Sequence, residues 1–332
     1  MKTNSISEFR RDLVTGNWIL IARGRADRPG HDKYEKEEDD PISSCPFEDP
    51  KKHGNEDPIL INKNSADWTL QVIPNKYPAV SGEGCPVEQS VGPYSMQGGL
   101  GFHEILITRD HSKHMALMAS GEILEVLSAY KSRYLDLAEE ECVRYISIFH
   151  NHGRRSGASL THPHSQLIAI PIMPSDFERS FGGSESFYKK NGKCVHCVMI
   201  AWELEDKKRV IFENSDFVAV CPYVSRGAYE VRIYPKAHSA WFEKISESAL
   251  ENLSQIFREV LASLYKKLDD PAYNFYLHTA AVPDSSSPDE YAGYHWHFDI
   301  RPRISMGAGF ELSTGIEIST VEPEYAAQVL RS

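Results

Sequence analysis

The chain has 332 residues, of which 41% are hydrophobic, so it is long enough for two domains or one duplicated unit around a sizeable core. Its formal net charge of −11 disfavours nonspecific binding to nucleic acids or membrane surfaces, because both are polyanions. No apolar run approaches the roughly 20 residues of a membrane span, and the first residues lack the apolar core of a secretory signal, so we expect a cytoplasmic protein.

The first half of the chain predicts two pairs of strands with a helix between the pairs. Strands are predicted where apolar and β-branched residues run together, at 71–80, 102–108, 145–151 and 165–171. Apolar residues at steps of four and three indicate the amphipathic helix, at Ile123, Leu127, Tyr130, Tyr134 and Leu137.

The second half predicts the same order of elements. Its strands are expected at 217–223, 229–235, 273–279 and 295–300. One face of its helix carries apolar residues at Leu250, Leu253, Phe257, Val260, Leu264 and Leu268. Ser248 and Glu251 fit a capping box at the start of this helix.

Polar residues repeat together with these elements. Asn151 follows His111, and His278 follows His238, by the same step of 40 residues. A His-x-His pair then follows in each half, at His162-Pro163-His164 and at His295-Trp296-His297. Although single elements match by chance, the equal step and the two pairs favour duplication.

The predicted fold is therefore α+β: a duplicated unit of antiparallel strands covered by helices. We expect a catalytic half at 1–171, a linker at 172–193 containing Gly182-Gly183-Ser184, and a second half at 194–332 with a structural metal site.

The first His-x-His pair is the candidate site of chemistry. Alternation along a strand places His162 and His164 on one face, together with Gln166. A neutral imidazole is a good nucleophile towards phosphorus, and Gln166 could donate a hydrogen bond to a phosphoryl oxygen. A lone His-x-His is more often a metal pair or two surface histidines. In the second half, however, Asp299 occupies the glutamine position, which points to the first half as catalytic.

At this point the sequence resembles a known family. The motif HPHSQ, preceded by NHGRRSGASLT, is similar to the galactose-1-phosphate uridylyltransferase branch of the histidine-triad superfamily. Further landmarks in the same order are GNWILIARGRADRP (16–29), VIPNKYPAV (72–80), RDHSKH (109–114), YPKAHS (234–239) and GFELSTG (309–315). The resemblance therefore extends over nearly the whole chain.

The resemblance implies a two-step exchange in which His164 displaces hexose 1-phosphate from UDP-glucose and briefly carries UMP, which galactose 1-phosphate then accepts. It implies nucleotide and phosphate contacts from Arg25, Arg28, Asn75, Lys76 and Asn151, with Ser159 and Gln166 beside the α-phosphate. It also implies that Phe310 and Glu311 bind the hexose, often as a segment donated by the other subunit of a homodimer.

Cysteine and histidine spacing predicts metal sites. Cys194 and Cys197 form a C-x-x-C pair that His238 and His295 would complete as a Cys2His2 zinc site. A redox role is less favoured, because no thioredoxin-like context surrounds the pair.

The equivalent set in the first half is Cys45, His111 and His162, with Glu48 where relatives often have a second cysteine. Relatives also imply iron at positions matching His278, His295 and His297, so Fe²⁺ is an alternative to zinc. We expect Cys85, Cys142 and Cys221 to be ordinary thiols, because six cysteines are too few for a disulfide framework in a chain of this length.

Two other functions stay open. An ADP-glucose phosphorylase would share HPHSQ, C-x-x-C and the GFEL segment, and would differ in base and acceptor. A nucleotide-binding protein without turnover is disfavoured by the intact His164 and Gln166.

Overall fold

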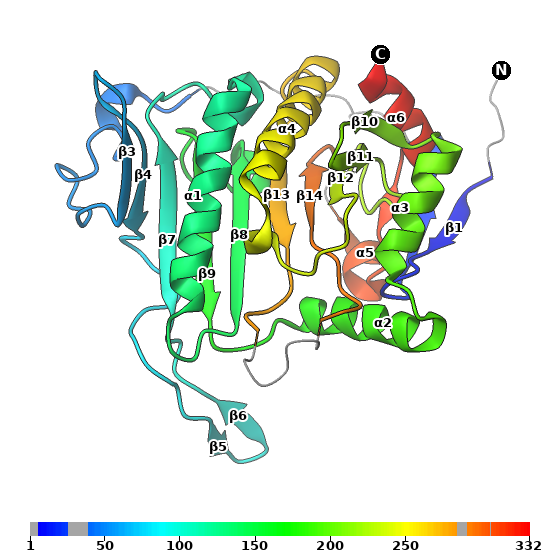
Figure 1. Ribbon diagram of the computed structural model, residues 1–332, viewed down its shortest axis with the longest axis horizontal. Helices are drawn as coiled ribbons and strands as arrows, with labels where there is room; N and C mark the ends of the chain where they lie inside the picture. Colours follow the sequence, from blue (N-terminus) through cyan, green and yellow to red (C-terminus); the bar gives the residue numbers. More distant parts are fainter. Residues whose placement is uncertain (1–5, 26–38, 284–290, 306) are drawn as a thin grey trace.

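A ten-stranded, largely antiparallel sheet forms the centre of the molecule in the computed structural model, in the order β10-β11-β12-β14-β13-β8-β9-β7-β4-β3 (Figure 1). The structure describes residues 6–25, 39–283, 291–305 and 307–332. Both predicted halves contribute to this one sheet, which confirms the α+β class.

The first half of the sheet follows the predicted order of elements. Its strands are β3 (Leu60–Lys63), β4 (Trp68–Pro74), β7 (Phe102–Thr108), β8 (Tyr145–His152) and β9 (His164–Ile170). Helix α1 (Ser120–Ala138) lies between β7 and β8 in the sequence. The strand expected at 71–80 is displaced towards the N-terminus and ends at Pro74.

The second half repeats this arrangement. Its strands are β10 (Val210–Glu213), β11 (Phe217–Val220), β12 (Val231–Pro235), β13 (Tyr273–His278) and β14 (His297–Pro302). Helix α4 (Glu247–Leu268) is the counterpart of α1. The expected capping box at Ser248 and Glu251 is wrong: Ser246 is the N-cap, and its side chain accepts a hydrogen bond from the backbone N–H of Ala249. Capping depends on the first helical turn, which here begins two residues earlier than expected.

The two halves are joined by strand pairing. β8 and β13 run antiparallel, with Asn151 opposite Asn274. Helices α1 and α4 lie side by side over the same face of the sheet (Figure 1). Their apolar faces and the strands beneath form one continuous core that extends across both halves. The duplicated units therefore fold as one body around one core.

The stretch between the halves is mostly helical. The expected linker contains α2 (Ser175–Asn191), and α3 (Val195–Asp206) follows it. Gly182 and Gly183 lie inside α2, and a side chain at Gly183 would overlap the carbonyl oxygen of Val14. This glycine therefore permits close packing of the helix against the N-terminal segment.

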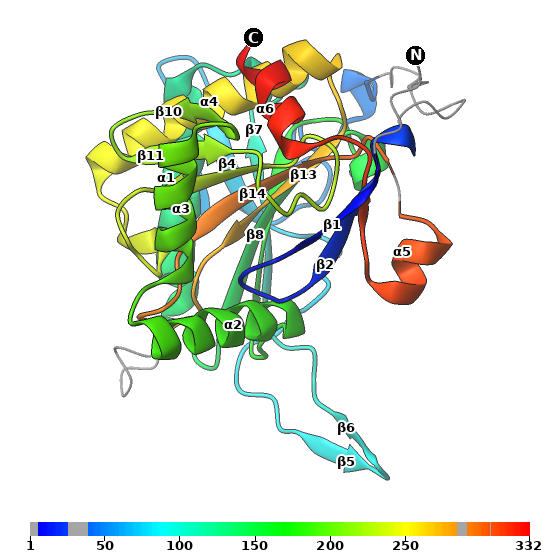
Figure 2. The ribbon, with the colours of Figure 1, turned by 90° about the vertical axis from the view of Figure 1, so that its right-hand side faces the viewer.

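A second, three-stranded sheet stands apart from the large one (Figure 2). It consists of β1 (Glu8–Arg11), β2 (Trp18–Ile21) and β15 (Ile318–Ser319), so it brings the two ends of the chain together. The short helix α5 (Gly309–Thr314) precedes β15, and α6 (Pro323–Arg331) follows it.

Two cysteines were assigned wrongly from the sequence. Cys85 and Cys142 form a disulfide across 57 residues and are therefore not ordinary thiols. Cys221 is a buried free cysteine, as expected. Cys85 precedes a projecting hairpin, formed by β5 (Gln89–Val91) and β6 (Tyr94–Met96) (Figure 2). Among the described residues, no helix is long and apolar enough to cross a membrane.

Candidate active site

His164 is held in one orientation by the turn that precedes its strand. Its Nδ1–H donates to the carbonyl oxygen of His162 at 2.8 Å, which leaves the lone pair on Nε2. The ring of Phe47 packs against it, with the ring centres 5.2 Å apart. The residue is only 6% exposed. Within the described ranges Nε2 has no hydrogen-bond partner. It is also not among the fully enclosed polar atoms, so a ligand can approach the ring from this side.

The environment of His164 favours the neutral ring. Burial lowers its pKa, and the hydrogen bond to the His162 carbonyl offsets this only in part. A neutral imidazole with a free Nε2 is the form that can attack an electrophile. The ring also lies outside the metal-like clusters described below.

Gln166 is oriented by a residue that the sequence did not reveal. His103, on the neighbouring strand β7, accepts a hydrogen bond at Nδ1 from the backbone N–H of Ala79 at 3.0 Å. Its Nε2 therefore carries the proton and donates to Oε1 of Gln166 at 2.8 Å. With Oε1 engaged, the amide NH2 of Gln166 is available as the donor towards a ligand.

The other expected phosphate-site residues lie at different ends of the strands. Asn75 lies against the ring of His103, and its side-chain oxygen accepts from the backbone N–H of Tyr77 at 2.9 Å. Lys76 donates to the carbonyl of His53 at 2.9 Å. Asn151 accepts from the side chain of Asn274 at 2.6 Å. Ser159 is exposed.

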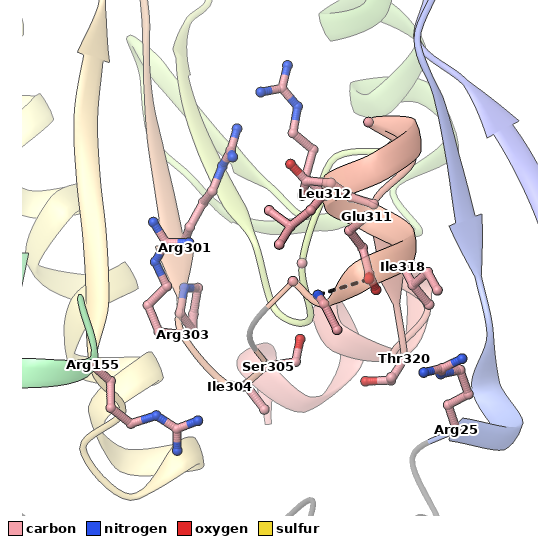
Figure 3. A pocket seen from close by; sticks show the side chains of 17 residues that line it. Arg25, Arg155, Arg301, Arg303, Ile304, Ser305, Glu311, Leu312, Ile318 and Thr320 are labelled. Carbon is pink, nitrogen blue, oxygen red and sulfur yellow. Dashed lines mark hydrogen bonds between the residues drawn. The ribbon is translucent and has the colours of Figure 1, made fainter. Parts of the chain in front are cut away.

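The expected hexose segment lines a separate, basic cavity of about 550 Å³ (Figure 3). Glu311 of α5 faces it, and its carboxylate accepts from the N–H of Ala308 at 3.0 Å. The cavity is lined by five arginines, Arg25, Arg155, Arg226, Arg301 and Arg303. Its lining does not include His164 or Gln166. Phe310 is 44% exposed beside it. Arg28 falls outside the described residues.

The predicted second-half metal ligands come together. Sγ of Cys197 lies 3.4 Å from Nδ1 of His238 and 3.5 Å from Nδ1 of His295. Sγ of Cys194 lies 3.9 Å from the same His295 nitrogen. The opposite nitrogen of His295 donates to the carbonyl of Pro235 at 2.9 Å, so its Nδ1 lone pair faces the thiols.

The chemistry of this second-half cluster fits zinc. Hydrogen bonds from Cys197 and from neighbouring histidines lower the pKa of Cys194, so a thiolate ligand is available. Two sulfurs and two imidazole nitrogens are the usual donors of a closed tetrahedral zinc site.

The first-half cluster contains Glu48 in place of a second thiol. Oε1 of Glu48 lies 3.0 Å from Nδ1 of His111 and 3.4 Å from Nδ1 of His162. Sγ of Cys45 lies 3.5 Å from the same His162 nitrogen. Burial raises the pKa of Glu48, but hydrogen bonds from Arg109 and His111 outweigh this and keep it a carboxylate. The donor set is one thiol, one carboxylate and two imidazoles.

The histidine pair of the second half has different surroundings. Nδ1 of His297 faces the carbonyl of His295 at 3.2 Å, as in the first half. Its ring stacks on His278, with centres 4.7 Å apart. Asp299, in the glutamine position, is 1% exposed and lies 3.1 Å from the Arg301 guanidinium. His278, His297 and Asp299 line a cavity of about 420 Å³.

Comparison with known proteins identifies the family of this chain. The family model that matches residues 1–174 is described as galactose-1-phosphate uridyl transferase, N-terminal domain. The chain belongs to this family. A second model, a domain of unknown function (DUF4921), matches residues 100–331.

Individual relatives of this uridylyltransferase family match almost the whole chain. An ADP-glucose phosphorylase from Arabidopsis thaliana is 33% identical over 99% of this chain and 93% of its own length. A galactose-1-phosphate uridylyltransferase from Thermotoga maritima is 28% identical over 98% of both. The crystal structure of the Arabidopsis phosphorylase with bound ADP-glucose superimposes with a TM-score of 0.81, at 30% identity over 98% of this chain and 99% of that one.

Two residues that contact the candidate site were not predicted from the sequence. His103 contacts Gln166, and Phe47 contacts His164. Each pair is far apart in the sequence. His103 does have a sequence signal, since a histidine interrupts the apolar run FHEILIT in the strand that pairs with β9, the strand of His164 and Gln166. Phe47 has none beyond its place next to Cys45.

Proposed function

We propose that the protein transfers a nucleoside monophosphate between a nucleoside-diphosphate hexose and a phosphorylated acceptor, through a covalent nucleotidyl-His164. The donor is UDP-glucose and the acceptor is galactose 1-phosphate. The supporting observation is the state of His164: its Nδ1–H donates to a carbonyl, its Nε2 has no partner among the described residues, and burial keeps the ring neutral.

In the first step, Nε2 of His164 attacks the α-phosphorus and forms a P–N bond. The bond between the α-phosphorus and the bridging oxygen breaks, and hexose 1-phosphate leaves with the electron pair. The imidazole then carries a positive charge, which the His162 carbonyl stabilises through the Nδ1–H bond at 2.8 Å. The Gln166 amide NH2, oriented by His103, donates to an α-phosphate oxygen.

In the second step, a phosphate oxygen of the incoming hexose 1-phosphate attacks the same phosphorus. The P–N bond breaks and its electron pair returns to Nε2, so His164 is regenerated neutral. No proton needs to be taken from a phosphate dianion, so the residues have only to position two anions. Arginines such as Arg25 and Arg303 in the basic cavity offset that repulsion.

The basic cavity does not include His164. The resemblance to the uridylyltransferase family suggests how the two could form one site, because the hexose segment in that family often comes from the other subunit. In a homodimer, α5 of one copy, with Phe310 and Glu311, completes the site around His164 of the other. This arrangement is tested by mixing His164→Asn with Glu311→Ala protein: a site shared between copies recovers part of the activity, whereas a site within one chain recovers none.

A second candidate is favoured by one observation. The Arabidopsis ADP-glucose phosphorylase is the more similar of the two relatives, at 33% against 28% identity. In this version AMP is carried by His164 and inorganic phosphate accepts it. The intact mass of the protein after incubation with UDP-glucose, and separately with ADP-glucose, distinguishes the two, because the adducts differ by the mass of the base. Tight nucleotide binding without any adduct would favour the non-catalytic alternative.

We also assign Zn²⁺ to the cluster of Cys194, Cys197, His238 and His295, with a structural role. A zinc ion at the first-half cluster would order the turn before His164, since His162 is two residues away. Metal analysis of the purified protein tests both assignments, and iron in place of zinc would contradict them.

A further inference from the structure

A third group of metal-type ligands lies where the two halves meet, away from both cysteine clusters. His114 stands just before a short 3-10 helix (Met115–Leu117), and His152 ends strand β8. Asp270 comes from the second half, in the turn between α4 and β13. One donor atom of each residue lies within 4.8 Å of the others.

Both imidazoles approach the same carboxylate oxygen. Oδ1 of Asp270 lies 2.9 Å from Nε2 of His152 and 3.7 Å from Nε2 of His114. The two rings lie 4.4 Å apart at their centres and are inclined by 32°. Asp270 is held there in the left-handed region of the backbone, with φ of 56°, a conformation that is unfavourable for most side chains.

A simple ion pair does not account for His114. The residue is 8% exposed, and its Nδ1 is enclosed without a partner among the described residues. Its Nε2 is too far from Asp270 for a hydrogen bond at 3.7 Å. Nε2 nevertheless faces the same carboxylate oxygen that His152 approaches, an arrangement that a metal ion shared by the three residues would account for.

We propose that His114, His152 and Asp270 bind a divalent transition metal ion, Zn²⁺ in the first instance, with water at the remaining position. Two imidazoles and one carboxylate are ligands that such ions prefer, and three protein ligands leave one tetrahedral position open. The ion would join the first half to the second half. It would also fix the end of β8, where Asn151 is the neighbour of His152.

Cobalt titration of the metal-free protein tests this site, because its ligands include no sulfur. Co²⁺ bound by thiolate gives an intense charge-transfer band, whereas Co²⁺ bound by two histidines and an aspartate gives only weak d–d absorption. We expect one equivalent of Co²⁺ per chain to bind without the charge-transfer band. If every bound equivalent brings thiolate charge transfer, the proposal is wrong.

Asp270→Asn should remove this equivalent and leave the thiolate bands unchanged. Asp269→Asn is the matched control, because it makes the same chemical change at a neighbouring left-handed position, with φ of 55°, whose carboxylate is outside the cluster. His114→Gln provides a second variant should Asp270→Asn fold poorly. If Asp270→Asn and His114→Gln bind as much Co²⁺ without the thiolate band as wild type does, the assignment is also wrong.

Discussion

The two halves place the same His-x-His motif on equivalent strands, yet they surround it differently. On β9, Gln166 is paired across the sheet with Ile105 and Phe149, which cannot neutralise or bind a charge. On β14, Asp299 is paired with Arg232 and Tyr276, and Arg301 also reaches it. In the first half, the amide of Gln166 is therefore available to donate to a ligand. In the second half, the carboxylate of Asp299 is paired with Arg232 and Arg301.

The difference shows how a duplicated unit divides its roles. Burial alone would raise the pKa of Asp299, but Arg301 and Arg232 overcome this and keep it well below its usual range. A buried network of this kind is stable only while all partners are present. His164 and His297 both have Nδ1 engaged by a carbonyl, so the halves differ in the residue two positions on: the Gln166 amide can donate to a ligand, whereas Asp299 is paired with arginines.

The contrast between the two halves is tested most directly by replacing His164 and His297 with asparagine in two separate variants. His164→Asn should lower kcat/KM by a factor on the order of 10⁴ to 10⁶, because the covalent intermediate cannot form. His297→Asn should retain activity within about tenfold, because its half lacks the glutamine. Steady-state assays of both variants with the same donor decide the point. Similar losses in the two variants would show that both halves react.

Gln166 should matter for rate and not for stability. Gln166→Ala should reduce kcat by about 10²- to 10³-fold, as expected for removal of one donor to a developing charge. Its unfolding midpoint in urea should stay close to that of wild type, because the side chain is only half-buried. A loss confined to KM would instead assign Gln166 to ground-state binding.

Asp299 should show the opposite pattern. Asp299→Asn leaves the buried Arg232 and Arg301 facing a neutral side chain, and we expect a loss of about 3 kcal/mol in the free energy of unfolding. Urea denaturation measures it, with Asp216→Asn at a partly exposed site as the control. An unchanged midpoint would mean that the network contributes nothing to stability.

The pH dependence of kcat/KM is the smallest of the expected effects. Because burial lowers the pKa of His164 below 6.5, more than half of the protein is in the reactive, neutral form at pH 6.5. Protonation removes the nucleophile, so kcat/KM should lose less than half of its value between pH 7.5 and 6.5 and then fall more steeply, approaching about tenfold per unit. A half-maximal value above pH 6.5 would contradict the buried, neutral ring.

Much of the fold was predictable because its signals are local. The strand expected at 102–108 has those bounds as β7, and the repeated order of strands and helices predicted the duplicated α+β unit. The cysteine and histidine ligands could also be grouped, since the repeat aligns His111 with His238. Local patterns thus predicted which cysteines and histidines lie together, but not what surrounds them.

What could not be predicted depends on contacts between distant segments. The Cys85–Cys142 disulfide requires the base of a hairpin to meet the turn before β8. The glycines of 172–193 suggested a linker, yet Gly183 packs inside a helix against Val14. The histidine that orients Gln166 and the aspartate that meets His152 come from other strands and turns, so spacing along the chain gives no measure of their approach.

The most direct test of the account is the location of the covalent adduct. After incubation with the donor nucleotide sugar and rapid quenching at alkaline pH, peptide mapping should find one nucleoside monophosphate per chain, on the peptide that contains His164. The adduct should be acid-labile, as a phosphoramidate is, should disappear on addition of the acceptor, and should still form in His297→Asn. Exchange activity without any adduct, or an adduct on the His297 peptide, would contradict the central claim.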